Sequence, residues 1–145
     1  MNSEPKQVTI LLVEDDPGHA RLIEKNLRRA RFYNPIVTKF NGQQALDYLF
    51  QLHAETGAAS MPLLVLLDLN LPVLDGYQVL ARIKSDPRTR HIPVIVLTTT
   101  DDTGEISRCY ELGCSVYITK PVDYEHFSEA IRKLGLFLSV VSVPK

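Results

Sequence analysis

The sequence predicts an α/β fold: a doubly wound, five-stranded parallel sheet with strand order 2-1-3-4-5. Five short apolar segments, rich in β-branched residues, alternate with segments whose apolar residues recur at helical spacing. Right-handed crossovers between parallel strands then place helices on both faces of the sheet. The common order for five such units makes the first and third strands neighbours, and ligands bind where those two strands end.

The first half of the chain supplies two strands and two helices. Residues 8–13 are almost all apolar, and the acidic run 14–16 ends this strand. Asp16 before Pro17 is typical of a helix N-cap, a role we prefer over metal ligation for Asp16, and this helix should end near residues 33–35. Residues 36–40 predict an edge strand, and Asn41-Gly42 opens the second helix. The residues expected to face inward are Ala20, Ile23, Leu27 and Ala30, then Ala45, Leu46 and Leu49.

The second half supplies three strands and three helices. Residues 63–67 form an uninterrupted apolar run, typical of a central buried strand, which delivers Asp68 to its carboxyl end. A helix opens at Asp75-Gly76 and closes at 86–87, because the residue before proline resists helical ψ. Strands at 93–97 and 115–119 flank a helix ending at Gly113, and a last helix starts near Asp123. The inward residues expected of these helices are Val79, Leu80 and Ile83; Ile106, Cys109 and Tyr110; and Phe127, Ala130, Ile131, Leu134 and Leu138.

Composition narrows the classes of function. A chain of 145 residues, 45% of them hydrophobic, fits a single domain spanning 1–145 with a complete core. A net charge of -1 argues against direct contact with nucleic acid. The polar N-terminus lacks a signal peptide and no apolar stretch is long enough for a membrane span, so we expect a cytoplasmic protein. Residues 136–145 form an apolar C-terminal extension, which favours burial against the domain or a second subunit.

Two reactive residue types receive no functional role. Cys109 and Cys114 lack the spacing of a metal site, so we interpret both as small buried hydrophobic residues. The four histidines, His19, His53, His91 and His126, are scattered, and we expect none of them to lie beside another ligand type. We therefore expect each histidine to be a surface residue.

Four of the predicted strands end beside the expected ligand site, and each is followed or ended by residues suited to phosphate or metal. These residues are Glu14 and Asp15, then Asp68, then Thr98, then Lys120. Three carboxylates at one point would raise each other's pKa unless a cation lay among them. Oxygen donors without nearby His or Cys favour a hard ion, and Mg²⁺ is the natural choice. Three carboxylates and one lysine sum to minus two, which one divalent cation neutralises. Asp68 is then the best-placed nucleophile for phosphoryl transfer.

Five motifs in order resemble response regulator receiver domains of the CheY-like type, over nearly the whole chain. They are residues 12–16 (LVEDD), 67–72 (LDLNLP), 75–76 (DG), 97–99 (LTT) and 117–121 (YITKP). The resemblance implies a flavodoxin-like receiver fold and a two-component phosphorelay protein that relays its signal by contact with another protein. It also implies a switch that catalyses only its own phosphorylation and dephosphorylation, and so not an enzyme in the ordinary sense.

The resemblance assigns roles to the acidic residues. It implies that Asp68 is the phosphoacceptor, that Asp15 binds Mg²⁺ directly and Glu14 through water, and that Asn70 binds it through its backbone carbonyl. Two residues depart from the family's pattern. Glu14 stands where aspartate is commoner. Thr99 stands where many relatives carry the smaller alanine, which narrows the entrance for the phosphoryl group. Neither departure removes a group that the reaction needs.

The resemblance also assigns the cation and the switch. Lys120 should pair with the phosphoryl group. The Thr98 hydroxyl should move to bond a phosphoryl oxygen, and the Tyr117 ring should then rotate into the vacated space. The Lys120-Pro121 bond is expected to be cis, which costs little before proline.

Within the family the chain looks most like small regulators paired with bacterial and cyanobacterial phytochromes, through residues 67–72, 92–99, 109–113 and the apolar tail. This likeness implies a light-sensing histidine kinase or a phosphotransfer protein as partner. It also implies a homodimer through strand five, the last helices and the C-terminal tail. The basic residues Arg21, Lys25 and Arg28 form either a solvated helix face or a kinase contact.

Two other classes of function stay open. A metal-dependent phosphatase with an aspartyl nucleophile also uses a carboxylate and Mg²⁺, but Asn70 stands where such enzymes need an acid. Turnover of a phosphomonoester would support that reading. A receiver fold used only for docking would bind a kinase without taking label from acetyl phosphate. At single positions, Asp68 as a turn residue and Tyr117 as an ordinary core residue are the structural alternatives.

Overall fold

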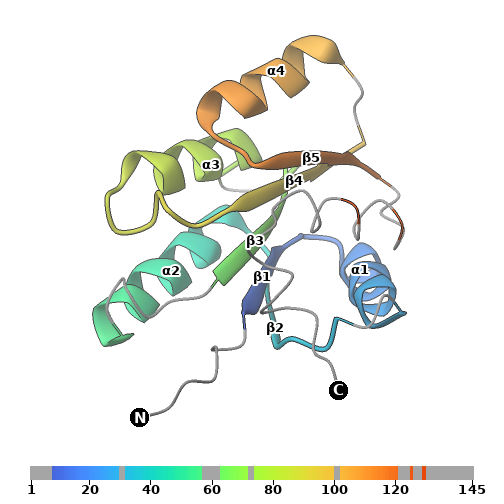
Figure 1. Ribbon diagram of the computed structural model, residues 1–145, viewed down its shortest axis with the longest axis horizontal. Helices are drawn as coiled ribbons and strands as arrows, with labels where there is room; N and C mark the ends of the chain where they lie inside the picture. Colours follow the sequence, from blue (N-terminus) through green and yellow to red (C-terminus); the bar gives the residue numbers. More distant parts are fainter. Residues whose placement is uncertain are drawn as a thin grey trace.

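The computed structural model describes residues 8–29, 32–56, 63–71, 74–99 and 102–120, together with Glu125 and Glu129. Within these ranges, five strands form one sheet with order β2-β1-β3-β4-β5, and every neighbouring pair is parallel (Figure 1). The strands are β1 (Thr9–Val13), β2 (Ile36–Lys39), β3 (Leu63–Asp68), β4 (Val94–Thr98) and β5 (Val116–Thr119). The predicted fold class and strand order are confirmed.

Helices cover both faces of the sheet. They are α1 (Pro17–Arg29), α2 (Gly42–Thr56), α3 (Gly76–Ser85) and α4 (Thr103–Leu112). Figure 1 shows α1 on one side of the sheet and the other three on the opposite side. The last predicted helix, from Asp123, and the extension 136–145 lie outside the described residues, apart from Glu125 and Glu129. No helix in the described part of the chain has both the length and the apolar character needed to cross a bilayer.

The central strands bury both of their faces. In β1, Leu11 joins the core beneath α2, α3 and α4, whereas Leu12 joins the core beneath α1, because successive strand residues point to opposite faces. All six residues of β3 are buried, and all four of the edge strand β2 are only half-buried. A polar residue on a central strand therefore escapes this apolar interior only at the end of the strand.

Capping residues fix where the helices begin and end. The Asp16 carboxylate accepts from the Gly18 amide at 2.8 Å, which confirms its capping role at α1. Asp75 and Gln78 form a reciprocal capping box at the start of α3. Gly113 ends α4 in the left-handed conformation, with φ of 108°, as its predicted cap position requires. These contacts define the start of α1, the start of α3 and the end of α4.

One predicted core residue of α4 is exposed. Cys109 and Cys114 are buried, as expected, and Ile106 is half-buried. Tyr110 is 49% exposed, so the prediction that it faces inward is wrong. α4 packs beside β5 and α3 at the end of the sheet, where only a narrow stripe of the helix meets the core. A residue one position beyond Cys109 is turned about 100° away from that stripe.

Candidate acidic site at the carboxyl edge of the sheet

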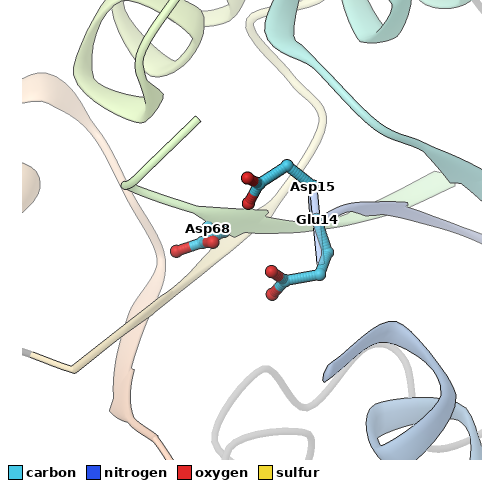
Figure 2. Close-up of side chains that lie close together, drawn as sticks. All are labelled: Glu14, Asp15 and Asp68. Carbon is cyan, nitrogen blue, oxygen red and sulfur yellow. The ribbon is translucent and has the colours of Figure 1, made fainter. Parts of the chain in front are cut away.

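Three carboxylates meet where β1 and β3 end. Val13 pairs with Leu67 in the sheet, so Glu14 and Asp68, the next residue of each strand, emerge side by side. One oxygen from each of Glu14, Asp15 and Asp68 lies within 4.8 Å of the other two. Figure 2 shows the three carboxylate groups gathered at these strand ends. Glu14 and Asp68 are buried, whereas Asp15 is exposed.

A lysine from the end of β5 reaches into this group. The Lys120 Nζ atom lies 2.7 Å from Glu14 Oε1 and 3.4 Å from Asp68 Oδ2. The Lys120 amide also donates to the carbonyl of Thr98 at 2.6 Å, which ties the end of β5 to the end of β4. Lys120 therefore neutralises part of the acidic charge, and its closer partner is Glu14.

The ionisation of Asp68 reflects this crowding. The pKa of the Asp68 carboxyl is raised to about 6, chiefly because the group is buried; the Lys120 ammonium opposes this rise and the Glu14 carboxylate adds to it. The Asn70 amide donates to Asp68 Oδ1 at 3.2 Å, which favours the charged form. A cation placed among the carboxylates would favour ionisation further, because it offsets both burial and like-charge repulsion.

The donor atoms fit a hard divalent cation. Carboxylate oxygens are the preferred ligands of Mg²⁺ and Mn²⁺, and Mg²⁺ is commonly held by one or two carboxylates together with water. Here two buried acids and one exposed acid face one another, so a cation there would keep an open side toward solvent. Asn70 is exposed directly beside them. The residues present therefore fit the Mg²⁺ site that the sequence predicts.

Thr98 and Tyr117 lie on the two strands beyond β3. Thr98 ends β4, is 1% exposed and pairs with Thr119 of β5. Tyr117 pairs with Val96 and packs, half-buried, against the core beneath α2, α3 and α4. Thr98 thus reaches the same edge of the sheet as Asp68 and Lys120, while Tyr117 lies further back along β5. Their switching roles stay predictions.

One neighbour of the site was missed by the sequence interpretation. His19 Nδ1 lies 3.7 Å from Glu14 Oε2 and 3.8 Å from Asp16 Oδ2. His19 is a surface residue, as expected, but the expectation that it lies beside no ligand type is wrong. Its place in the first turn of α1, directly after the acidic run, was the available signal. The His19 amide donates to Asp16 Oδ1 at 3.2 Å, and the His19 side chain then lies beside Glu14.

Comparison with known proteins identifies the class. The family model for the response regulator receiver domain matches residues 10–132. The chain belongs to this family, whose members are the receiver domains of response regulators in two-component signalling. Receiver domains are signalling switches that bind Mg²⁺ or Mn²⁺ at an acidic pocket.

Two curated relatives are similar to the chain over most of its length. It is 36% identical to the response regulator Rcp1 of Synechocystis sp. over 143 residues, covering 98% of this chain and 96% of Rcp1. It is 42% identical to the probable methanogenesis regulatory protein FilR2 of Methanothrix harundinacea over 125 residues, covering 86% and 79%.

Solved structures of response regulators are also similar to the chain. A response regulator receiver domain from Rhodospirillum rubrum is 56% identical, with a TM-score of 0.73 over 94% of this chain and 96% of that one. The bacteriophytochrome response regulator AtBRR is 40% identical, with a TM-score of 0.79 over 92% and 96%. The Mn²⁺-bound form of Rcp1 is 33% identical, with a TM-score of 0.69 over 97% and 98%. The predicted resemblance to phytochrome-partnered regulators is confirmed.

Proposed function

We propose that Asp68 accepts a phosphoryl group from the phosphohistidine of a sensor kinase or of a phosphotransfer protein. One observation carries this proposal: a buried carboxylate ends the central strand, with two more acids within 4.8 Å and an ammonium at 3.4 Å. An Asp68 oxygen attacks phosphorus, the phosphorus–nitrogen bond breaks, and its electron pair returns to the imidazole. The product is an acyl phosphate on Asp68.

The other acids, by holding a cation, and Lys120 would compensate the negative charge that the phosphoryl group adds. Asp15 and Asp68 would bind Mg²⁺ directly, Glu14 through water, and Asn70 through its backbone carbonyl. When bound, the cation would supply positive charge beside the phosphoryl oxygens. Lys120 lies between Glu14 and Asp68, so a small shift of its ammonium from Glu14 would let it pair with a phosphoryl oxygen.

Thr98 and Tyr117 would carry the signal outward. The Thr98 hydroxyl, at the end of the strand beside Asp68, would bond a phosphoryl oxygen, and Tyr117 would then turn inward. A complete switch from about 1:99 to 99:1 needs roughly 5.5 kcal/mol of differential stabilisation. New bonds from Thr98 and Lys120 to one phosphoryl group are the source we propose for it.

The proposed partner is a light-sensing histidine kinase of the phytochrome class. The likeness to AtBRR and Rcp1 over more than nine-tenths of the chain supports this choice. We further propose that residues 1–145 form a single receiver domain with an apolar extension at 136–145. A homodimer through β5, the last helices and that extension would carry the output.

Acetyl phosphate with Mg²⁺ tests the phosphoacceptor directly. Intact-mass measurement should show one added phosphoryl group on the wild type and none on Asp68→Asn. Asp75→Asn is the matched control, because Asp75 is an exposed helix cap and should be labelled like the wild type. Equal labelling of Asp68→Asn and wild type would remove Asp68 from its role.

A purified bacteriophytochrome kinase, autophosphorylated with labelled ATP, tests the partner class. Label should move to the wild-type protein within minutes and should not move to Asp68→Asn. Labelling by acetyl phosphate without any transfer from this kinase would preserve the phosphoacceptor and contradict the partner. Steady turnover of a phosphomonoester would instead favour the phosphatase alternative.

A further inference from the structure

We propose that Tyr77 is a positioning residue that holds α4 in its resting place and thereby limits how readily Asp68 is phosphorylated. The Tyr77 hydroxyl donates to Glu105 Oε1 at 2.9 Å. The Arg108 guanidinium lies over the Tyr77 ring, 4.1 Å from its centroid. These three residues, here called the α3–α4 strap, join two helices that lie side by side in Figure 1. This inference rests on the proposed function of Asp68.

The α3 end of the strap is fixed to the strand end that carries Asp68. The amide of Gly76, directly before Tyr77, donates to the carbonyl of Leu69 at 2.9 Å. A Cβ atom on Gly76 would lie 2.4 Å from Leu69 Cα and 2.6 Å from the Asp68 carbonyl oxygen. The start of α3 is therefore packed directly on the backbone at residues 68–69. Tyr77 has little freedom to follow α4 if α4 moves.

The α4 end of the strap comes soon after Thr98 in the chain, because α4 is the element that follows β4. Asp102 caps α4 by accepting from the Gly104 amide, and Glu105 lies in the first helical turn. A displacement of the chain after Thr98 would therefore move Glu105 relative to Tyr77. The strap therefore links α3, which follows β3, to α4, which follows β4, and β3 and β4 are neighbours in the sheet.

The contacts of the strap can break without disturbing the buried core. Glu105 and Arg108 are exposed, so their side chains contribute little to the buried core. Burial and the Glu105 carboxylate both raise the pKa of Tyr77, so its hydroxyl stays protonated and keeps donating. A contact that exists in only one of two states biases the equilibrium toward that state by its own free energy. Loss of one such hydrogen bond shifts an equilibrium by about threefold to tenfold.

The first test removes one hydroxyl. Tyr77→Phe keeps the ring beneath Arg108 but cannot donate to Glu105, so labelling by acetyl phosphate with Mg²⁺ should be at least about threefold faster than in the wild type. Tyr110→Phe, which removes a hydroxyl from an exposed tyrosine of α4, is the matched control and should label at the wild-type rate. Equal rates for Tyr77→Phe and wild type would overturn the proposal.

The partner residue gives the second test. Glu105→Ala should accelerate labelling like Tyr77→Phe, and the double variant should show no further increase, because both changes break one bond. Glu105→Gln keeps an acceptor oxygen and should restore a rate near that of the wild type. Independent, multiplicative increases in the double variant would contradict a shared contact.

Hydrogen exchange separates the strap from a purely structural role. In the unphosphorylated protein, α4 amides should exchange faster in Tyr77→Phe, while amides of β1 and β3 stay as protected as in the wild type. A uniform loss of protection across the sheet would show that Tyr77 only stabilises the fold, and would overturn the proposal. Labelling of Asp68→Asn would instead mean that the proposed function has failed, because the strap variants all retain Asp68.

Discussion

The middle of β3 and its carboxyl end are both buried, but aliphatic side chains surround the middle and charged side chains surround the end. Leu66, in the middle of β3, is fully buried among aliphatic side chains. Asp68, two residues later, is 3% exposed and Glu14 is 1% exposed, with one lysine between the two acids. The same strand therefore gains stability from its interior and gives some of it up at its end. This cost falls on the residues for which we propose phosphoryl transfer.

The sheet interior should respond most strongly to mutation. Leu66→Ala removes fully buried methyl groups from the core beneath α1 and should lower the free energy of unfolding by about 3 kcal/mol. Urea unfolding at pH 7 in the presence of a chelator measures this change. A loss well under about 1 kcal/mol would mean that the interior is less tightly packed than its burial indicates.

The junction between interior and edge should come next. Gly76→Ala pushes a methyl group against the backbone of residues 68–69, so we expect a loss of about 2 kcal/mol. Because the displaced backbone carries Asp68, labelling by acetyl phosphate should slow as well. Unchanged stability would show that the start of α3 is free to shift away from β3.

At the carboxyl edge a substitution should raise the free energy of unfolding instead of lowering it. Asp68→Asn replaces a buried carboxylate whose pKa is raised to about 6, while Lys120 keeps its closer partner Glu14. The metal-free protein should therefore become more stable at pH 7, by about 2 kcal/mol. Urea unfolding of both proteins with a chelator present measures the difference.

The pH dependence of that gain follows from the raised pKa of Asp68. The folded carboxyl binds its proton more tightly than the unfolded one, whose pKa is near 3.8, so the wild type loses stability as pH rises from about 4 through 6. The advantage of Asp68→Asn should therefore be small at pH 4 and full above pH 6. An advantage that does not change with pH would exclude charge burial as its cause.

The smallest effect is expected at an exposed carboxylate that contributes to stability. Asp75 caps α3 in a reciprocal capping box, so Asp75→Ala should lower the free energy of unfolding by about 1 kcal/mol. Asp75→Asn keeps a capping oxygen and should lose much less. The opposite signs at Asp68 and Asp75 would then separate the cost of burying a carboxylate from the benefit of one that caps a helix. Stabilisation by Asp75→Ala would break this comparison.

Local patterns in the sequence were enough to predict the order of the elements and the convergence of the acids. Apolar runs mark β1, β3 and β4 because these strands are covered on both faces, and the first polar residue after each run must lie at the carboxyl edge. Parallel pairing then brings Glu14 and Asp68 together without any knowledge of side-chain positions. Helix caps at Asp16, Asp75 and Gly113 were predictable for the same reason, since capping involves only near neighbours.

Only the tertiary structure decided how side chains from different elements meet. It placed His19 against Glu14, gave Lys120 a closer contact with Glu14 than with Asp68, and joined Tyr77 to Glu105. It also turned Tyr110 to solvent, because the way α4 sits at the end of the sheet sets the width of its buried stripe. Such pairings depend on helix rotation and on differences of an ångström in packing, which a periodic pattern along the chain does not encode.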